Sequence, residues 1–180
     1  MKTILIIGTI ILIIIIGLLL FPKKSDNGKI TTNMTISSSA FSNNAAIPSK
    51  YACDGEDINP PLSISDVPEN SKSLALIIDD PDSPSGAFTH WTVWNIDTSI
   101  KEISENSVPK SGVEGMTDFG KIGYGGPCPG TGKHRYFFKI YALDINLKLA
   151  KGAAKKDIEN AMTGHVSAQA ELVGLYQRIK

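Results

Sequence analysis

The chain has 180 residues, with 18 lysines and arginines against 18 aspartates and glutamates, so its formal net charge is zero. This length suits a single domain with a real core, and the ordinary globular composition excludes disordered and collagen-like proteins. Because the chain carries no surplus of basic residues, we expect no nucleic-acid partner.

The first predicted element is an uncharged apolar stretch over residues 3–21. As a helix it would extend about 28 Å, close to the roughly 30 Å hydrocarbon core of a bilayer. Since no small-residue cleavage site precedes Pro22, residues 1–22 are predicted to be a transmembrane anchor or an uncleaved signal. The polar residues 23–33 then form a linker to a domain over residues 34–180.

The domain contains short apolar runs separated by clusters of Pro, Gly, Asn, Asp and Ser. This pattern of apolar runs and turn residues predicts an all-β domain with long loops. The predicted strands are at residues 34–41, 73–78, 91–96, 135–143 and, from its period-two alternation, 166–172. Residues 153–162 carry an apolar i, i+3, i+4 stripe followed by Gly164, which predicts one short helix.

An acidic residue and a histidine follow the predicted strand at residues 73–78. Asp80 follows the apolar run of that strand, at the point where Pro81 and Pro84 make the chain turn. Because a proline fixes its own φ and restricts the residue before it, Asp80 and Ser83 lose freedom before any ligand arrives. His90 follows after a short loop, which indicates a preorganised polar site.

A second loop precedes the other histidine of interest. Gly123, Gly125 and Gly126 have access to backbone angles that are closed to other residues, so we expect successive N–H groups to point into one concavity that accepts a negative oxygen. His134 begins the following apolar strand and is expected to face the mouth of the loop. The two segments together predict a site for a small anion.

Asp80 is the expected support for one of the imidazoles. If it lies beside either ring, it fixes the tautomer and raises the pKa, so that the ring can donate to a phosphate or carboxylate. Simpler alternatives stay open, because His90 could be satisfied by a backbone carbonyl and His134 could be a solvated strand end. Tyr136 could be a core residue with only its hydroxyl at the rim of the pocket.

Several ordered runs resemble the signatures of the phosphatidylethanolamine-binding protein (PEBP) family, whose prokaryotic branch is called Raf kinase inhibitor-like. The runs that carry the resemblance are residues 79–84 (DDPDSP), 89–91 (THW), 126–129 (GPCP) and 134–136 (HRY), with further similarity over 50–62 and 164–176. The resemblance spans nearly everything from about Thr35 to the C-terminus.

The resemblance implies a mainly β, antiparallel β-sandwich with long loops and one or two short helices. It also implies a small surface pocket for phosphate-type anions and phosphorylated head groups. The ligand-binding residues predicted from the loops and the resemblance together are Asp80, His90, Gly125, Gly126, Pro127, His134 and Tyr136. Gly130 stands where many relatives have a second proline, which leaves the ligand selectivity open.

The leading functional hypothesis is a membrane-tethered binding module that needs no cofactor and is not an enzyme. The resemblance also implies a possible role in modulating a partner kinase or protease. The alternative is a hydrolase in which His90 or His134 is the general base and Asp80 orients it, although no serine lies in a Gly-x-Ser-x-Gly elbow. These three residues with Cys128 could supply four zinc ligands, but their spacing matches no standard zinc pattern, so no metal is expected.

The compartment depends on the two cysteines and on the charges that flank the apolar stretch. Lys23 and Lys24 favour a cytoplasmic domain, whereas the extreme N-terminal position of the stretch favours export. Cys53 and Cys128 both lie in loops beside the family motifs. We expect them to pair in a domain outside the cytoplasm, against the alternative of two reduced thiols in the cytosol.

Overall fold

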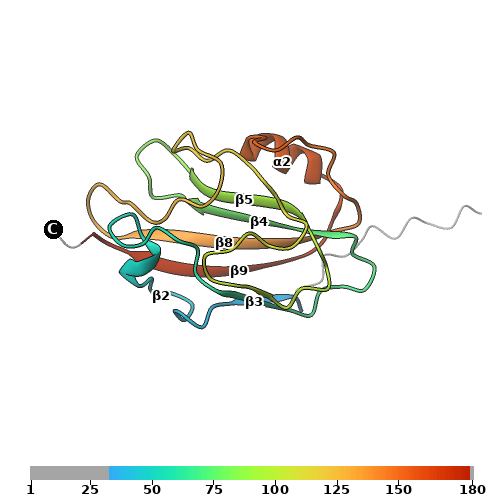
Figure 1. Cartoon of the computed structure of the whole chain (residues 1–180), viewed down its shortest axis with the longest axis horizontal. Coiled ribbons are helices and arrows are strands. Elements are labelled where there is room, and N and C mark those ends of the chain that lie inside the picture. The colour runs from blue at the N-terminus through green and yellow to red at the C-terminus, as the bar shows by residue number, and fades with distance from the viewer. Residues whose placement is uncertain (1–32, 179–180) are drawn as a thin grey trace, which may run out of the picture.

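The computed structural model describes residues 33–178, which form two β-sheets packed face to face with one α-helix (Figure 1). The larger sheet has six strands in the order β2 (Ala45–Ala46), β9 (Val166–Tyr176), β8 (His134–Leu143), β4 (Ser73–Asp80), β5 (Phe88–Ile96) and β7 (Val113–Glu114). The smaller sheet has the order β1 (Thr35–Ser37), β3 (Leu62–Ser65) and β6 (Glu102–Ile103). A single 3-10 turn, η1 (Ser49–Tyr51), precedes β3, and the helix α2 (Lys155–Met162) precedes β9.

The prediction of a mainly β fold with one α-helix is confirmed. All strand pairs in the described chain are antiparallel except one, in which β2 pairs in parallel with β9 through Ala45 and Gly174. A Cβ atom built on Gly174 would lie 2.5 Å from Ile47 Cγ1. The absence of a side chain at Gly174 therefore lets the segment after β2 pack closely against β9.

β4 is buried on both faces along its whole length. Leu76 and Ile78 belong to the core between the two sheets, whereas Ala75 and Ile77 belong to a second cluster beneath α2. Successive side chains of a strand point to opposite faces, so a central strand covered on both sides reads as a continuous apolar run. The sandwich therefore holds β4, and with it the position of Asp80, between two packed layers.

Several predicted boundaries move by a few residues. β1 ends at Ser37 rather than at residue 41, because the Ser38 hydroxyl donates to the Pro61 carbonyl and accepts from the Ala40 amide, which takes the chain out of the ladder. β9 continues past the predicted end to Tyr176, because that residue pairs with His134 at the start of β8. The alternating pattern was thus a better guide to β9 than the helical propensity of its alanines.

The predicted anchor over residues 1–22 and nearly all of the predicted linker over residues 23–33 lie outside the described residues. Among residues 33–178, no helix combines the length and the apolar character that crossing a bilayer requires.

Two adjacent carboxylates on β4 serve opposite faces of the sheet. Asp79 faces α2, where Lys139 Nζ donates to both of its oxygens at 2.8 and 3.0 Å and Lys155 Nζ lies 3.4 Å away. Only 3% of the Asp79 side chain is exposed, so this is a buried charge neutralised by two lysines. Asp80 has the other orientation and belongs to the site described below.

Replacing Asp79 with Ala is expected to lower the free energy of unfolding by about 2 kcal/mol, because two lysines lose a buried partner. Urea denaturation of the variant and the wild type measures the difference. Glu159→Ala is the matched control, because Glu159 pairs with Lys155 at 2.8 Å from an exposed position and should contribute less than about 0.5 kcal/mol. Equal losses in the two variants would contradict this assignment.

Candidate functional site

A small open cavity lies at the edge of the larger sheet where β4 ends and where β5 and β8 begin. Its volume is about 110 Å³, and it is lined by Asp80, Ser83, Pro84, Phe88, His90, Phe119, Cys128, Pro129, Gly130 and His134. A cavity of this size has room for a small polyatomic group.

Asp80 and His134 form a largely buried pair of side chains in the lining of the cavity. His134 Nδ1 donates to Asp80 Oδ2 at 2.8 Å, and the Asp82 amide donates to Asp80 Oδ1 at 2.8 Å. Only 5% of the Asp80 side chain and 13% of the His134 side chain are exposed. The expected contact of Asp80 with an imidazole is thus found at His134, and it leaves Nε2 as the ring nitrogen that remains for a ligand.

His90 is oriented by the backbone of the glycine-rich loop. Its Nδ1 lies 2.7 Å from the Gly125 carbonyl oxygen, and because a carbonyl only accepts, Nδ1 carries the proton and Nε2 is bare in the neutral ring. The ring packs between Phe88, Phe119 and Tyr136, with centroids 5.3, 5.2 and 5.1 Å away. His90 is therefore both hydrogen-bonded to a backbone carbonyl, as the simpler alternative allowed, and part of the cavity lining.

The pKa of His90 moves in the opposite direction from the one predicted for a ring beside an acid. Burial lowers the pKa because it disfavours the charged imidazolium, and this outweighs the opposing effects of the Gly125 carbonyl and of the Asp80 charge. His90 thus enters the site as a neutral ring.

The expected concavity of free amides in the glycine-rich loop is wrong for Gly125 and Gly126. The Gly125 amide donates to the His90 carbonyl at 2.9 Å, and the Gly126 amide donates to Asp57 Oδ1 at 2.6 Å. The Pro127 carbonyl accepts from the Cys53 amide at 3.1 Å. Gly125, Gly126 and Pro127 therefore shape the wall behind the cavity, and the cavity lining itself does not include them.

Tyr136 is fully buried behind the two imidazoles. Burial raises the pKa of its hydroxyl, and the charge of Asp80 raises it further. Within residues 33–178 the hydroxyl oxygen has no hydrogen-bond partner. Tyr136 is thus a core residue whose polar end points toward the acidic side of the site, as the alternative reading of the sequence allowed.

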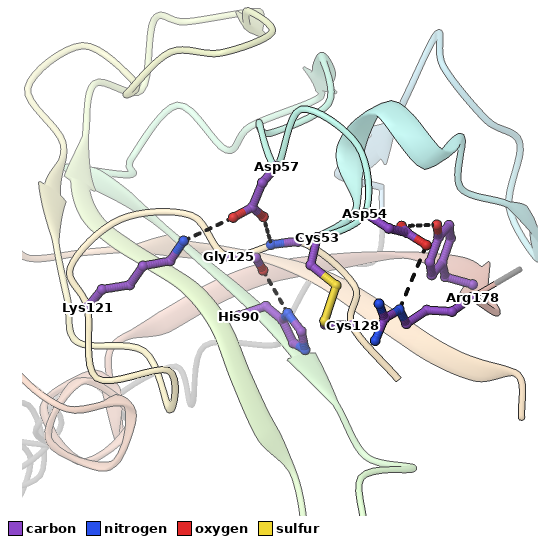
Figure 2. The surroundings of a disulfide bond; sticks show 10 residues. Cys53, Asp54, Asp57, His90, Lys121, Gly125, Cys128 and Arg178 are labelled. Carbon is purple, nitrogen blue, oxygen red and sulfur yellow. Dashed lines mark hydrogen bonds and ion pairs between the residues drawn. A yellow bond between two sulfur atoms is a disulfide. The ribbon is translucent and has the colours of Figure 1, made fainter. Parts of the chain in front are cut away.

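The disulfide between Cys53 and Cys128 is present, as predicted, and it closes the site from one side (Figure 2). It joins positions 75 residues apart, which in the chain-entropy description stabilises the fold by about 4 kcal/mol. Because Cys128 is in this bond, its sulfur is not available as a thiolate ligand for zinc. In the described part of the chain, no cluster of three or more metal-ligating side chains was found.

The sequence did not indicate the aromatic wall of the cavity. Phe88 and Phe119 meet edge to face, with ring centroids 4.7 Å apart, and Phe119 is 41% exposed. Phe88 immediately precedes the 89–91 motif, so it was within reach of sequence reasoning. Phe119 comes from a separate loop with no local signal, and only the fold brings it to the rim of the cavity.

The cavity contains little positive charge. No lysine or arginine lines it within residues 33–178. Arg135, which follows His134, is held by Asp82 through bonds of 2.9 and 2.6 Å to its two carboxylate oxygens. Arg135 is thus an ion-pair partner of Asp82, and the imidazoles of His90 and His134 are the basic side chains of the lining.

A fold of two packed sheets with this histidine site defines a known class of protein. The profile of the phosphatidylethanolamine-binding protein family matches residues 37–177. A UPF0098 protein of Pyrococcus horikoshii is 54% identical over 151 residues, covering 78% of this chain and 75% of the relative. A UPF0098 protein of Methanothermobacter thermautotrophicus is 50% identical over 150 residues, covering 81% of this chain and 99% of the relative.

Two solved structures that resemble this chain are described as members of the same family. A crystal structure described as a PEBP homolog from Chlamydia trachomatis has a TM-score of 0.79 at 43% identity, covering 83% of this chain and all of that one. YbcL of Escherichia coli, described as a new member of the mammalian PEBP family, has a TM-score of 0.77 at 27% identity, covering 82% of this chain and all of that one. The chain belongs to the phosphatidylethanolamine-binding protein family.

The low pKa of His90 predicts a specific dependence of stability on pH. Below about pH 6.5 the unfolded chain binds more protons at this residue than the folded chain, so the free energy of unfolding decreases as the pH falls through that window. In His90→Gln this contribution is absent, and the loss of stability between about pH 7 and about pH 5 should be smaller. Urea denaturation at the two pH values measures it; an unchanged pH dependence would show that His90 titrates normally.

Proposed function

We propose that the cavity binds a small anion or the phosphorylated head group of a larger molecule, and that the domain is a binding module rather than an enzyme. The observation that carries the proposal is the pairing of His134 with Asp80. With Nδ1 bonded to the carboxylate at 2.8 Å, a protonated His134 directs its second N–H toward the ligand side of the cavity. The neutral His90 lies beside it in the same lining.

The site places an acidic and a basic side chain in direct contact. Asp80 alone would repel an anion, and His134 is the residue that offsets it. The apolar rings of Phe88 and Phe119 lower the local polarity, which strengthens a charge-assisted hydrogen bond to the bound group.

The chain has only three histidines, so a full-length protein labelled in histidine reports on the site directly. Titration with inorganic phosphate or phosphoethanolamine should shift the ring signals of His90 and His134. His165, which pairs with Asp144 at 2.8 Å on an exposed surface, is the internal control. Replacing His134 with Ala should weaken phosphate binding about tenfold or more, the cost of one charge-assisted hydrogen bond. Signals of His90 and His134 that do not respond would refute the proposal.

The rival function is hydrolysis, and the geometry favours binding over it. In the described chain neither imidazole is hydrogen-bonded to a hydroxyl. The hydroxyl of Ser83 is instead hydrogen-bonded to that of Ser85 at 3.0 Å. A screen of phosphate and carboxylic esters against the wild type and His134→Ala separates the two functions. Turnover that disappears in the variant would replace the binding proposal with an enzymatic one.

We further propose that residues 1–22 tether the domain on the outer side of a membrane. The disulfide supports this location, because such bonds persist in oxidising compartments. Thiol labelling of denatured protein from the native host should leave Cys53 and Cys128 unmodified until a reductant is added. Immediate labelling of both would point to the cytosol instead. A role in modulating a partner kinase or protease stays a prediction of the family resemblance.

A further inference from the structure

We infer that Asp57, a residue outside the cavity, is a positioning residue that sets the orientation and tautomer of His90 through one peptide group. The inference rests on the proposed function only for its effect on ligand affinity. The geometric part concerns the protein alone and is testable without a ligand.

Asp57 and His90 bind the same peptide unit from opposite sides (Figure 2). The Gly126 N–H donates to Asp57 Oδ1 at 2.6 Å, and the Gly125 carbonyl accepts from His90 Nδ1 at 2.7 Å. This N–H and this carbonyl belong to one planar trans peptide, in which they point in opposite directions. A change at the carboxylate is therefore transmitted to the imidazole without any intervening side chain.

The negative charge of Asp57 also acts on the strength of the bond to His90. A carboxylate that accepts from the N–H polarises the peptide, and the carbonyl at its other end becomes a better acceptor. A stronger acceptor favours the tautomer with the proton on Nδ1. An aspartate thus orients each imidazole of the cavity. Asp80 accepts directly from His134, and Asp57 acts on His90 through a peptide group.

The local backbone is built around this contact. Asp57 has a φ of +55°, a left-handed conformation that Asp and Asn adopt more readily than most residues. A Cβ atom on Gly126 would lie 2.3 Å from the Tyr51 carbonyl oxygen and 2.9 Å from Asp57 Oδ1. Glycine at position 126 therefore permits the close approach that brings the carboxylate to the amide.

Other contacts hold the loop in place, so the carboxylate can be removed without losing the loop. The Tyr124 hydroxyl donates to the Tyr51 carbonyl at 2.9 Å, and the Cys53–Cys128 disulfide joins the same two segments. Lys121 Nζ donates to Asp57 Oδ2 at 3.1 Å on the exposed side. The role of Asp57 is thereby separable from the general attachment of the loop.

The test uses full-length protein labelled with ¹⁵N in its histidine rings, without ligand and then with inorganic phosphate. In the wild type, the ring nitrogens of His90 should show a protonated Nδ1 and a bare Nε2. In Asp57→Ala, they should move toward a mixture of tautomers, while those of His134 and His165 stay in place. Phosphate affinity should fall about tenfold, the lower range for loss of an outer-shell partner. Asp57→Asn, which keeps an oxygen acceptor and tolerates the backbone, should show a smaller change of the same kind.

Asp54→Ala is the matched control from the same segment, because Asp54 contacts Tyr176 and Arg178 and not the 125–126 peptide (Figure 2). It should leave the His90 ring nitrogens unchanged. Unchanged His90 signals in a folded Asp57→Ala variant, or equal shifts in all three histidines, would overturn the inference. If Asp57→Ala does not fold, Asp57→Asn decides in the same way. A wild type that does not bind phosphate refutes the proposed function, while the ligand-free ring signals still decide the role of Asp57.

Discussion

The hydrogen bond between His90 Nδ1 and the Gly125 carbonyl joins two parts of the protein that differ in character. His90 belongs to a nine-residue strand of the buried sheet, whereas Gly125 lies in an irregular loop. A reciprocal bond from the Gly125 amide to the His90 carbonyl makes the junction a two-point contact. The cavity depends on this contact, because it is the loop that brings Cys128, Pro129 and Gly130 over the ends of the strands. The disulfide and Asp57 hold the loop from its far side.

The alternation of side chains along β4 separates stability from ligand chemistry at neighbouring residues. Asp79 faces two lysines beneath α2, and Asp80 faces His134 at the cavity. Burial on both sides of the strand keeps either carboxylate from being solvated, so each must find partners within the protein. A shift of one residue in this strand would exchange the two roles, which ties the site to the register of the whole sheet.

The sequence predicted the mainly β fold because apolar periodicity is a local signal. It also predicted the disulfide and the contact of Asp80 with a histidine, because these residues lie in or beside the family motifs. It mispredicted the amides of Gly125 and Gly126, since their partners, His90 and Asp57, are about 35 and 70 residues away and only the tertiary fold supplies them. It also missed Phe119, an exposed aromatic residue whose meaning depends on its contact with Phe88. Local structure and contacts between motif residues were therefore predictable, whereas the partners that compete for a backbone amide were not.

The small size of the cavity limits which part of a ligand the proposed site would contact. A ligand of the proposed kind would place only its terminal group within a volume of about 110 Å³, and the rest of its carrier would lie outside, beyond the ring of Phe119. Recognition of this kind is indifferent to whether the carrier is a metabolite, a lipid or a modified side chain. Under the proposed function, any preference among carriers would come from the outer edge of the opening, where the exposed Phe119 lies.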